Sequence, residues 1–455
     1  MRGVIFRCTL LIRLVNLAAV RRMYRVLIIS YYFPPGNGVG SWRPYSWFKH
    51  FPDNNIQTTV ITRHWNGNEK LWDDWISENN KSVSVERFDD SVIVRLPYKY
   101  SALKKIVQSR WFRISGLSKL AHLLLEFAGR FSIEIDACHA FKKYITEYLK
   151  ENNFDAILVS SPPLNTIRLA HELSLQYNIP FIADFRDLWT NDELIVNYNP
   201  ELSRKIRNGL IKFYLKKWLK NAAFVTTVSS PLAKKISGLT TKETLEITNG
   251  FEQELFHNQS EKPRREVFTV SVIGTLHPKQ DITVMIKGFK KFLGIVPEKK
   301  VRLNFIGVEA FKSVADEIKK RLPGESIFAT PRISREEAIR YTMQSHVLFY
   351  PGWKNYQGIY SGKIFDYLGA RRNILIAPGD DDVIDNIVLK TGAGKISNSA
   401  DELCDALMQW YDEWEKAGEL IYFGKDELIN KYTREGQAKI LAAKIKSVLD
   451  KQTKS

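Results

Sequence analysis

Short apolar runs alternate with longer amphipathic segments along the chain from residue 24 onward. Residues 24–30 (YRVLIIS) are mostly apolar, and a Gly/Pro-rich loop connects them to a segment whose apolar positions recur at helical spacing. Apolar runs of this length predict strands that are buried on both faces, as in parallel sheets. Because helical sequence separates the predicted strands, the pattern favours a doubly wound α/β sheet over a sandwich or a barrel.

This alternation occurs twice. In the first half, further strands are predicted at residues 58–62, 92–96, 156–160, 180–184 and 223–228. Residues 250–266 interrupt it, because they are charged, lack apolar periodicity and contain a proline. Beyond them, strands are predicted at residues 268–273, 301–306, 346–350 and 373–377. The chain is therefore predicted to contain two α/β sheets, one after the other.

Chain length also favours two domains, since one hydrophobic core rarely grows beyond about 250–300 residues and this chain has 455. We predict an N-terminal extension over residues 1–22, a Rossmann-like domain over 23–250, a linker over 251–266, a second Rossmann-like domain over 267–428 and a C-terminal helix segment over 429–455. The amphipathic residues 435–450 are expected to form that helix and to pack back on the first domain.

The first 22 residues form a basic stretch whose apolar run is interrupted by Arg7 and Arg13. Such a segment is too short and too charged to span a bilayer, and it lacks a clear cleavage site for a signal peptide. We expect a non-native upstream extension of a reading frame that begins at Met23. A basic amphipathic anchor and a targeting peptide are the alternatives.

Charge and cysteine content narrow the function classes. The formal charge of +17 implies an anionic partner, which can be nucleic acid, an acidic membrane face or a phosphorylated substrate. No recognised nucleic-acid-binding module accompanies the charge. Cys8, Cys138 and Cys404 are far apart and form no CxxC pair, so neither a disulfide framework nor a zinc site is predicted. A reducing, cytoplasmic location fits best.

The loop after the first strand has the composition of a phosphate cradle. It contains Gly36, Gly38 and Gly40 ahead of a helix, so that backbone N–H groups can approach a pyrophosphate at the positive end of the helix. Arg43, one helical turn further on, adds a guanidinium that complements phosphate charge. The alternative is that the glycines serve only tight packing.

A second cluster of charged residues follows the strand predicted at residues 180–184. Asp184, Arg186 and Asp187 fall within four residues, where the carboxyl ends of strands form the ligand-facing rim of an open α/β sheet. A local Asp–Arg ion pair that orders the loop is the alternative interpretation.

Two lysines in the second half of the chain are candidates for binding phosphate. Lys363 and Asp366 are three residues apart, so on a helix they share a face and can present a cation to phosphate and a carboxylate to sugar or ribose hydroxyls. An i,i+3 surface pair is the alternative. Lys279 follows Gly274 and Thr275 just after the first predicted strand of the second sheet, and by itself it would be interpreted as a solvated surface lysine.

Five segments together resemble glycosyltransferase family 4, in particular the branch that builds bacterial surface polysaccharides. They are YYFPPGNGVGSWR, IPFIADFRDLWT, VTTVSS followed by ITNGFEQELF, VIGTLHPKQD and SGKIFDYLGARRNILIAPG. The first looks like the family's acceptor-side and phosphate loop. The last is similar to the segment around the second glutamate of the family's paired-glutamate motif. The resemblance covers nearly the whole chain from residue 24.

The resemblance implies the GT-B fold, with two facing Rossmann-like domains and the nucleotide-sugar donor in the cleft between them. It implies retaining hexosyl transfer to a glycan or lipid-linked acceptor in capsule, O-antigen or exopolysaccharide synthesis. It implies no obligatory metal and no cofactor besides the donor substrate. The implied catalytic residues are Arg186, Asp187, Lys279 and Lys363. The implied donor-binding residues are Gly38, Val39, Gly40, Arg43, Gly274, Thr275, Lys279, Lys363, Ile364 and Asp366.

Four positions depart from the family pattern. Arg186 stands where many relatives carry a histidine, and Asp366 replaces the second motif glutamate. Gly358 stands where the first glutamate would fall, and Thr275 replaces an arginine, which leaves Lys279 and Lys363 to neutralise the diphosphate. Several of these changes are shared within the surface-polysaccharide branch, so we interpret them as divergence rather than loss of activity.

Residues 98–130 form a basic segment that also carries Trp111, Phe112 and several leucines. Such segments can lie in an anionic lipid interface, so peripheral membrane contact near a lipid-linked acceptor is predicted, while packing on the protein's own core is the alternative. Two other functions stay open, namely a nucleotide-sugar-binding protein without catalysis and a sugar-nucleotide 2-epimerase. Hydride transfer is weaker, because no acidic residue follows the glycine loop in the ribose-binding register.

Overall fold

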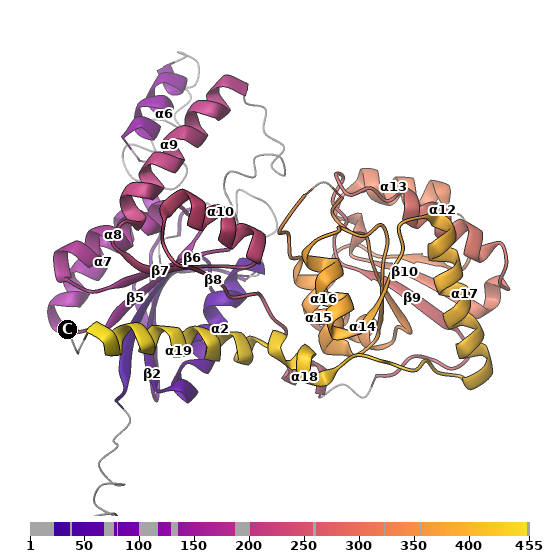
Figure 1. Ribbon diagram of the computed structural model, residues 1–455. Helices are drawn as coiled ribbons and strands as arrows, with labels where there is room; N and C mark the ends of the chain where they lie inside the picture. The colour runs from indigo at the N-terminus through magenta and orange to yellow at the C-terminus, as the bar shows by residue number, and fades with distance from the viewer. Residues whose placement is uncertain are drawn as a thin grey trace, which may run out of the picture. The chain divides into compact units, whose positions relative to one another are not determined.

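The computed structural model describes residues 22–36, 39–67, 77–79, 81–99, 117–128, 135–186, 201–257, 261–322, 324–354 and 356–452 (Figure 1). Gly38, Asp187 and residues 1–21, for which predictions were made, lie outside these ranges, as does much of the basic segment 98–130. The chain divides into two compact units, one of Met1–Asp184, Lys217–Ala223 and Leu441–Ser455 and the other of Phe185–Lys216 and Phe224–Ile440.

The first sheet has eight strands in the order β3-β4-β2-β1-β5-β6-β7-β8. Their bounds are β1 (Tyr24–Ser30), β2 (Ile56–Arg63), β3 (Ser84–Phe88), β4 (Ser91–Leu96), β5 (Ala156–Ser161), β6 (Phe181–Phe185), β7 (Ala222–Thr227) and β8 (Thr244–Glu246). β1 pairs in parallel with both β2 and β5, while β3 at the edge runs antiparallel to β4. β5 is buried along its whole length, as its continuous apolar run predicts.

Helices follow most of these strands. The described ones are α2 (Trp42–His50), α6 (Leu117–Phe127), α7 (Ile135–Glu151), α8 (Asn165–Tyr177), α9 (Glu201–Leu219) and α10 (Ser230–Thr240). A short 3₁₀ turn, η1 (Val39–Ser41), leads into α2. α8 lies against β5 and β1, which is the packing that a βαβ crossover produces.

The second sheet has six strands, all parallel to their neighbours, in the order β11-β10-β9-β12-β13-β14. They are β9 (Phe268–Ile273), β10 (Val301–Ile306), β11 (Ile327–Ala329), β12 (Val347–Tyr350), β13 (Asn373–Ile376) and β14 (Gly394–Ile396). The accompanying helices are α11 (Glu254–His257), α12 (Thr283–Leu293), α13 (Lys312–Arg321), α14 (Arg335–Met343), α15 (Gly362–Ala370), α16 (Val383–Thr391), α17 (Ala400–Ala417), α18 (Asp426–Ile429) and α19 (Arg434–Gln452).

Helices cover both faces of the second sheet (Figure 1). Val270 and Val272 of β9 join one apolar core with α12 and α17, while Ile273 joins another with α15 and α16. Successive side chains of a strand point to opposite faces, so β9 contributes to both cores. The predicted α/β class with two parallel-sheet domains is confirmed, and every predicted strand is present within two residues.

Four strands were missed, and all are weakly apolar or very short. β3 is largely exposed, and β8, β11 and β14 have three half-buried or exposed residues each. Edge positions bury too little side-chain surface to impose an apolar pattern, so the sequence carries little signal there.

The predicted C-terminal helix is present as α19. Its last residues belong to the same compact unit as β1. There the Tyr24 hydroxyl hydrogen-bonds the Asp450 carboxylate, and Lys446 Nζ donates to the Asn54 carbonyl oxygen at 3.0 Å. Across the described ranges, no helix is both long enough and apolar enough to cross a bilayer.

Candidate functional site

The site is built at the carboxyl ends of β9 and β12, where α15 is fastened to the sheet. Tyr367 of α15 is fully buried, and its hydroxyl accepts the Ile273 N–H at 2.9 Å and donates to the Phe349 carbonyl oxygen at 3.2 Å. One phenol therefore ties the helix to the last residue of β9 and to β12. Lys363 lies one turn earlier on the same helix face, which places it beside the turn that follows β9.

That turn has a shape that leaves room for the lysine. Gly274 has φ +82°, and a Cβ atom added there would lie 3.1 Å from Lys363 Cε. A side chain at this position would therefore meet both an unfavourable backbone conformation and the lysine stem. Lys363 Nζ donates a hydrogen bond to the Thr275 carbonyl oxygen, so the lysine lies across the turn.

Lys363 also lies in the first turn of α15. Ser361 caps α15, its hydroxyl accepting the Lys363 N–H at 3.4 Å. The lysine and the positive end of the helix dipole thus act in the same place, which is favourable for an anion. Burial lowers the pKa of Lys363 to about 7, because removing the ammonium from water disfavours its charged form.

The loop after β9 is fixed by its own polar groups. Gln280 Nε2 donates to the Pro351 carbonyl oxygen at 2.8 Å, which ties the loop to the end of β12. His277 Nδ1 accepts the Lys279 N–H at 3.1 Å, and the ring lies 5.4 Å from the ring centroids of both Phe311 and Trp353. Burial, and then the charge of Lys279, lower the pKa of His277. The Lys279 side chain is exposed.

Asp366 is not paired with Lys363. Its carboxylate accepts a hydrogen bond from Arg335 Nη2 of α14 at 3.3 Å, and Lys363 donates a hydrogen bond to the Thr275 carbonyl oxygen. The i,i+3 pair considered from the sequence therefore does not form. Burial raises the pKa of Asp366, and the Arg335 charge opposes that rise. The Ile364 side chain is fully buried in the core with β9 and β12, so only its main chain can contribute to a site.

Gly358, where the family pattern has its first glutamate, sits in a turn with φ +76°. Its N–H is hydrogen-bonded to the Asp382 carboxylate at the start of α16. Asp380 in the same loop accepts the N–H groups of Asp382, Ile384 and Asp385. The sequence analysis missed Asp382, His277, Gln280, Arg335 and Tyr367, because single polar residues carry no periodic signal.

In the first sheet, the glycine loop serves packing at least in part. A Cβ atom added to Gly36 would lie 3.0 Å from both the Phe33 carbonyl oxygen and the Trp65 ring. Val39 and Gly40 lie in η1, directly ahead of α2. Their predicted contact with phosphate stays a prediction.

Arg43 is buried, with 3% of its surface exposed, and its guanidinium pairs with Asp184 of β6, which is completely buried. Nε lies 3.1 and 3.0 Å from the two carboxylate oxygens, and Nη2 lies 2.6 Å from Oδ1. Ser160 Oγ adds a hydrogen bond to Asp184 at 3.4 Å. Asp184 is thus paired with an arginine from α2 that is 141 residues away in the sequence. Arg186 directly follows β6 and is half-buried.

No family model matches the sequence, and no curated protein matches it in sequence either. Solved structures match nearly the whole chain. A sucrose-phosphate synthase from Thermosynechococcus elongatus is 11% identical with a TM-score of 0.56, over 95% of this chain and 98% of that one. A UDP-forming trehalose-phosphate synthase from Burkholderia vietnamiensis is 11% identical with a TM-score of 0.59, over 94% and 100%.

A glycosyltransferase from Rickettsia africae is 10% identical with a TM-score of 0.59, over 94% of this chain and 99% of that one. The chain therefore has the GT-B fold. At this level of identity the likeness concerns the fold, and the candidate site rests on its own geometry. That geometry gathers Gly274, Thr275 and Lys363 at one turn, with Lys279 in the loop that follows.

Proposed function

We propose that this protein is a glycosyltransferase that moves a sugar from a nucleoside-diphosphate sugar to an acceptor hydroxyl. One observation carries the proposal. Lys363 lies across the Gly274 turn at the positive end of α15, at the carboxyl end of a parallel strand, where ligands of α/β proteins bind. A lysine, a helix N-terminus and a glycine turn are together suited to a diphosphate.

The chemistry needs charge stabilisation more than a nucleophile. The bond between the anomeric carbon and the diphosphate oxygen breaks, and the diphosphate leaves with the bonding electrons. The acceptor oxygen bonds the anomeric carbon, and its proton passes to the departing diphosphate. Lys363 is proposed to stabilise the leaving charge, with Lys279 as a second cation and Asp366 as a partner of donor hydroxyls.

The finer assignment rests on the family resemblance of the five motif segments. We infer retaining transfer onto a glycan or lipid-linked acceptor of a bacterial surface polysaccharide. The matched synthases support a nucleotide-sugar donor, because three of the matched proteins are named as UDP-forming. UDP and UDP-sugars are accordingly the first ligands to try.

Thermal-shift measurements with nucleoside diphosphates and their sugars test the proposal. A ligand at about 100 times its Kd adds about 2.7 kcal/mol to the stability of the folded state, so UDP or GDP should raise the Tm by several degrees. Product analysis with a lipid-linked acceptor should then show sugar transfer. Conversion of the donor without acceptor would indicate an epimerase. Binding without any turnover would indicate a binding protein, and a chain stabilised by no nucleotide would contradict the proposal.

We also propose that α6 contacts an anionic membrane near the acceptor. Leu120, Leu124 and Phe127 recur at helical spacing on one side of α6 and are 53%, 60% and 53% exposed. Exposed apolar side chains clustered on one helix face suit the acyl boundary of a bilayer, and the net charge of +17 suits its anionic headgroups.

Replacing Leu120 and Leu124 with aspartate should reduce binding to anionic vesicles by tenfold or more, since burying one leucine is worth about 1.5–3 kcal/mol. Cosedimentation at low salt measures this. Leu175→Asp is the control, because Leu175 of α8 is also 60% exposed but stands outside α6. Equal binding by the double variant and the wild type would remove the proposal.

A further inference from the structure

One face of the second sheet carries polar side chains over part of β9 and β10 and apolar side chains at their carboxyl ends. On the face covered by α14 to α16, Ile273 and Ile306 at the carboxyl ends of β9 and β10 belong to the apolar core. Before these isoleucines the same face carries polar residues, where the strand register pairs Arg302 with Thr269 and Asn304 with Ser271. A sheet buried on both faces would ordinarily be apolar there, so these four side chains need another explanation.

The polar residues form a fixed floor. Asn304 is buried, and its Nδ2 donates to Ser271 Oγ at 3.2 Å while its Oδ1 accepts Arg302 Nε at 3.2 Å. Ser345 Oγ lies 2.6 Å from both Ser271 Oγ and the Tyr341 carbonyl oxygen. The Arg302 guanidinium also stacks 4.8 Å from the centroid of the Phe328 ring. Asn304 and Phe328 therefore hold the Arg302 side chain in one place.

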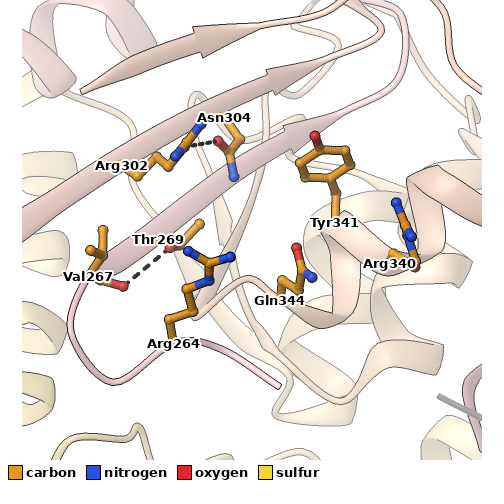
Figure 2. A pocket seen from close by; sticks show the side chains of 8 residues that line it. All are labelled: Arg264, Val267, Thr269, Arg302, Asn304, Arg340, Tyr341 and Gln344. Atoms are coloured by element: carbon orange, nitrogen blue, oxygen red, sulfur yellow. Dashed lines mark hydrogen bonds between the residues drawn. The ribbon is translucent and has the colours of Figure 1, made fainter. Parts of the chain in front are cut away.

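A pocket of about 220 Å³ lies above this floor (Figure 2). It is lined by Arg264, Val267, Thr269, Arg302, Asn304, Arg340, Tyr341 and Gln344. The three arginines come from three separate places, namely the segment before β9, β10 itself and α14. Gln344 Nε2 donates to Glu261 at 2.7 Å, which orients the amide. The pocket therefore offers three guanidinium groups, a phenol and an amide as polar contacts.

Within the described part of the chain, the three arginines form no ion pair, although the Glu261 carboxylate accepts a hydrogen bond from Gln344 at the edge of the pocket. Gathering three like charges in one pocket is unfavourable unless an anion joins them. Guanidinium groups bind phosphate through paired N–H donors, and a phosphate monoester carries about −1.5 to −2 charges and three acceptor oxygens.

We propose that this pocket binds the phosphate group of a small phosphate monoester, at a site separate from the proposed donor site. The two sites lie at different positions along the same parallel strands. Thr269 of the pocket lies four residues before Ile273 at the carboxyl end of β9, so about 13 Å of strand separates them. The pocket volume accommodates a phosphate with a few further atoms. The ligand can be a soluble phosphate ester or the headgroup of a lipid such as phosphatidic acid, which share this chemistry.

Calorimetric titration of the Lys363→Met variant tests the proposal, because that background weakens phosphate binding at the donor site. Glycerol phosphate and inorganic phosphate should bind with one saturable site. Arg264→Gln, added to this background, should raise the Kd about tenfold, since a charge-assisted contact is lost. Arg264 is exposed and its side chain forms no hydrogen bond within the described chain, so the substitution should leave the Tm unchanged.

Arg265→Gln is the matched control. It removes the same charge from the neighbouring residue, which does not line the pocket, and it should change the Kd less than about twofold. Vesicles with phosphatidic acid form a second arm. Binding to them that depends on Arg264 would identify a lipid headgroup, whereas binding of glycerol phosphate alone would identify a soluble ligand. The absence of saturable binding, or equal effects of Arg264→Gln and Arg265→Gln, would overturn the proposal.

Discussion

Replacing Lys363 with methionine should lower sugar transfer by about 100- to 1000-fold, the size of effect seen when one preorganised donor to a developing negative charge is removed. Methionine keeps the length of the aliphatic stem that packs against Gly274, and it removes the ammonium group that bonds Thr275. The fold should persist, because α15 is held to the sheet by Tyr367 rather than by the lysine. Steady-state rates with saturating donor measure the effect.

The lowered pKa of Lys363 adds a second measurable consequence, which is a pH dependence of nucleotide affinity. Burial lowers that pKa to about 7 in the free protein, so above pH 7 the amine is mostly neutral. A bound diphosphate favours the ammonium form, and binding must then take up a proton. Affinity for a nucleoside diphosphate should fall as pH rises from about 7 to 9, by up to tenfold per pH unit.

Below pH 7 the lysine is charged with and without ligand, so it contributes no slope there. The Lys363→Met variant should bind weakly and without this pH dependence. Lys287→Met is the control, since Lys287 is an exposed lysine of α12 away from the turn. If Lys363→Met and Lys287→Met transferred sugar equally well, the assigned role of Lys363 would be wrong.

Asp184→Asn should destabilise the first sheet by about 3–5 kcal/mol, the usual cost of leaving one member of a buried ion pair without its countercharge. Asparagine has nearly the same shape, so the change isolates the charge. The buried Arg43 guanidinium then loses the carboxylate that accepts hydrogen bonds from its Nε and Nη2 atoms. Amide hydrogen exchange in β1, β5 and β6 should speed up by two to three orders of magnitude or more.

Glu147→Gln provides the comparison. It is the same chemical change in an exposed pair with Lys150, where both side chains are more than half exposed, and it should cost less than about 1 kcal/mol. The double variant Arg43→Met/Asp184→Leu should recover much of the lost stability, because an apolar pair can replace a buried ion pair. A loss from Asp184→Asn as small as that from Glu147→Gln would contradict the prediction.

The two lysines show which properties of a site residue can be predicted from the sequence and which cannot. Lys279 follows the first predicted strand of the second sheet, and Lys363 shares a predicted helix face with Asp366. In the structure Lys279 lies in the loop after β9 and Lys363 in the first turn of α15. Their environments differ, however, since Lys279 is exposed while Lys363 is half-buried and has a depressed pKa. Burial depends on which residues cover a side chain, and those residues are distant in the sequence.

Arg43 shows the opposite case. Its position one turn after the glycine loop predicts a phosphate ligand, which stays a prediction, while in the structure its guanidinium pairs with Asp184, 141 residues later. The polar residues Thr269, Ser271, Arg302 and Asn304 look like ordinary breaks in two strands. Only the register of β9 and β10 brings them together beneath α14.

For this protein, the sequence by itself determined the two α/β sheets, their buried strands and the glycine and lysine positions at strand ends, because apolar periodicity and turn composition are local properties of the chain. The tertiary structure alone decided which charges meet. It paired Arg43 with Asp184, laid Lys363 across the Gly274 turn and gathered three arginines around one pocket. Electrostatic energy depends on distance and burial in space, and neither quantity can be computed from spacing along the chain.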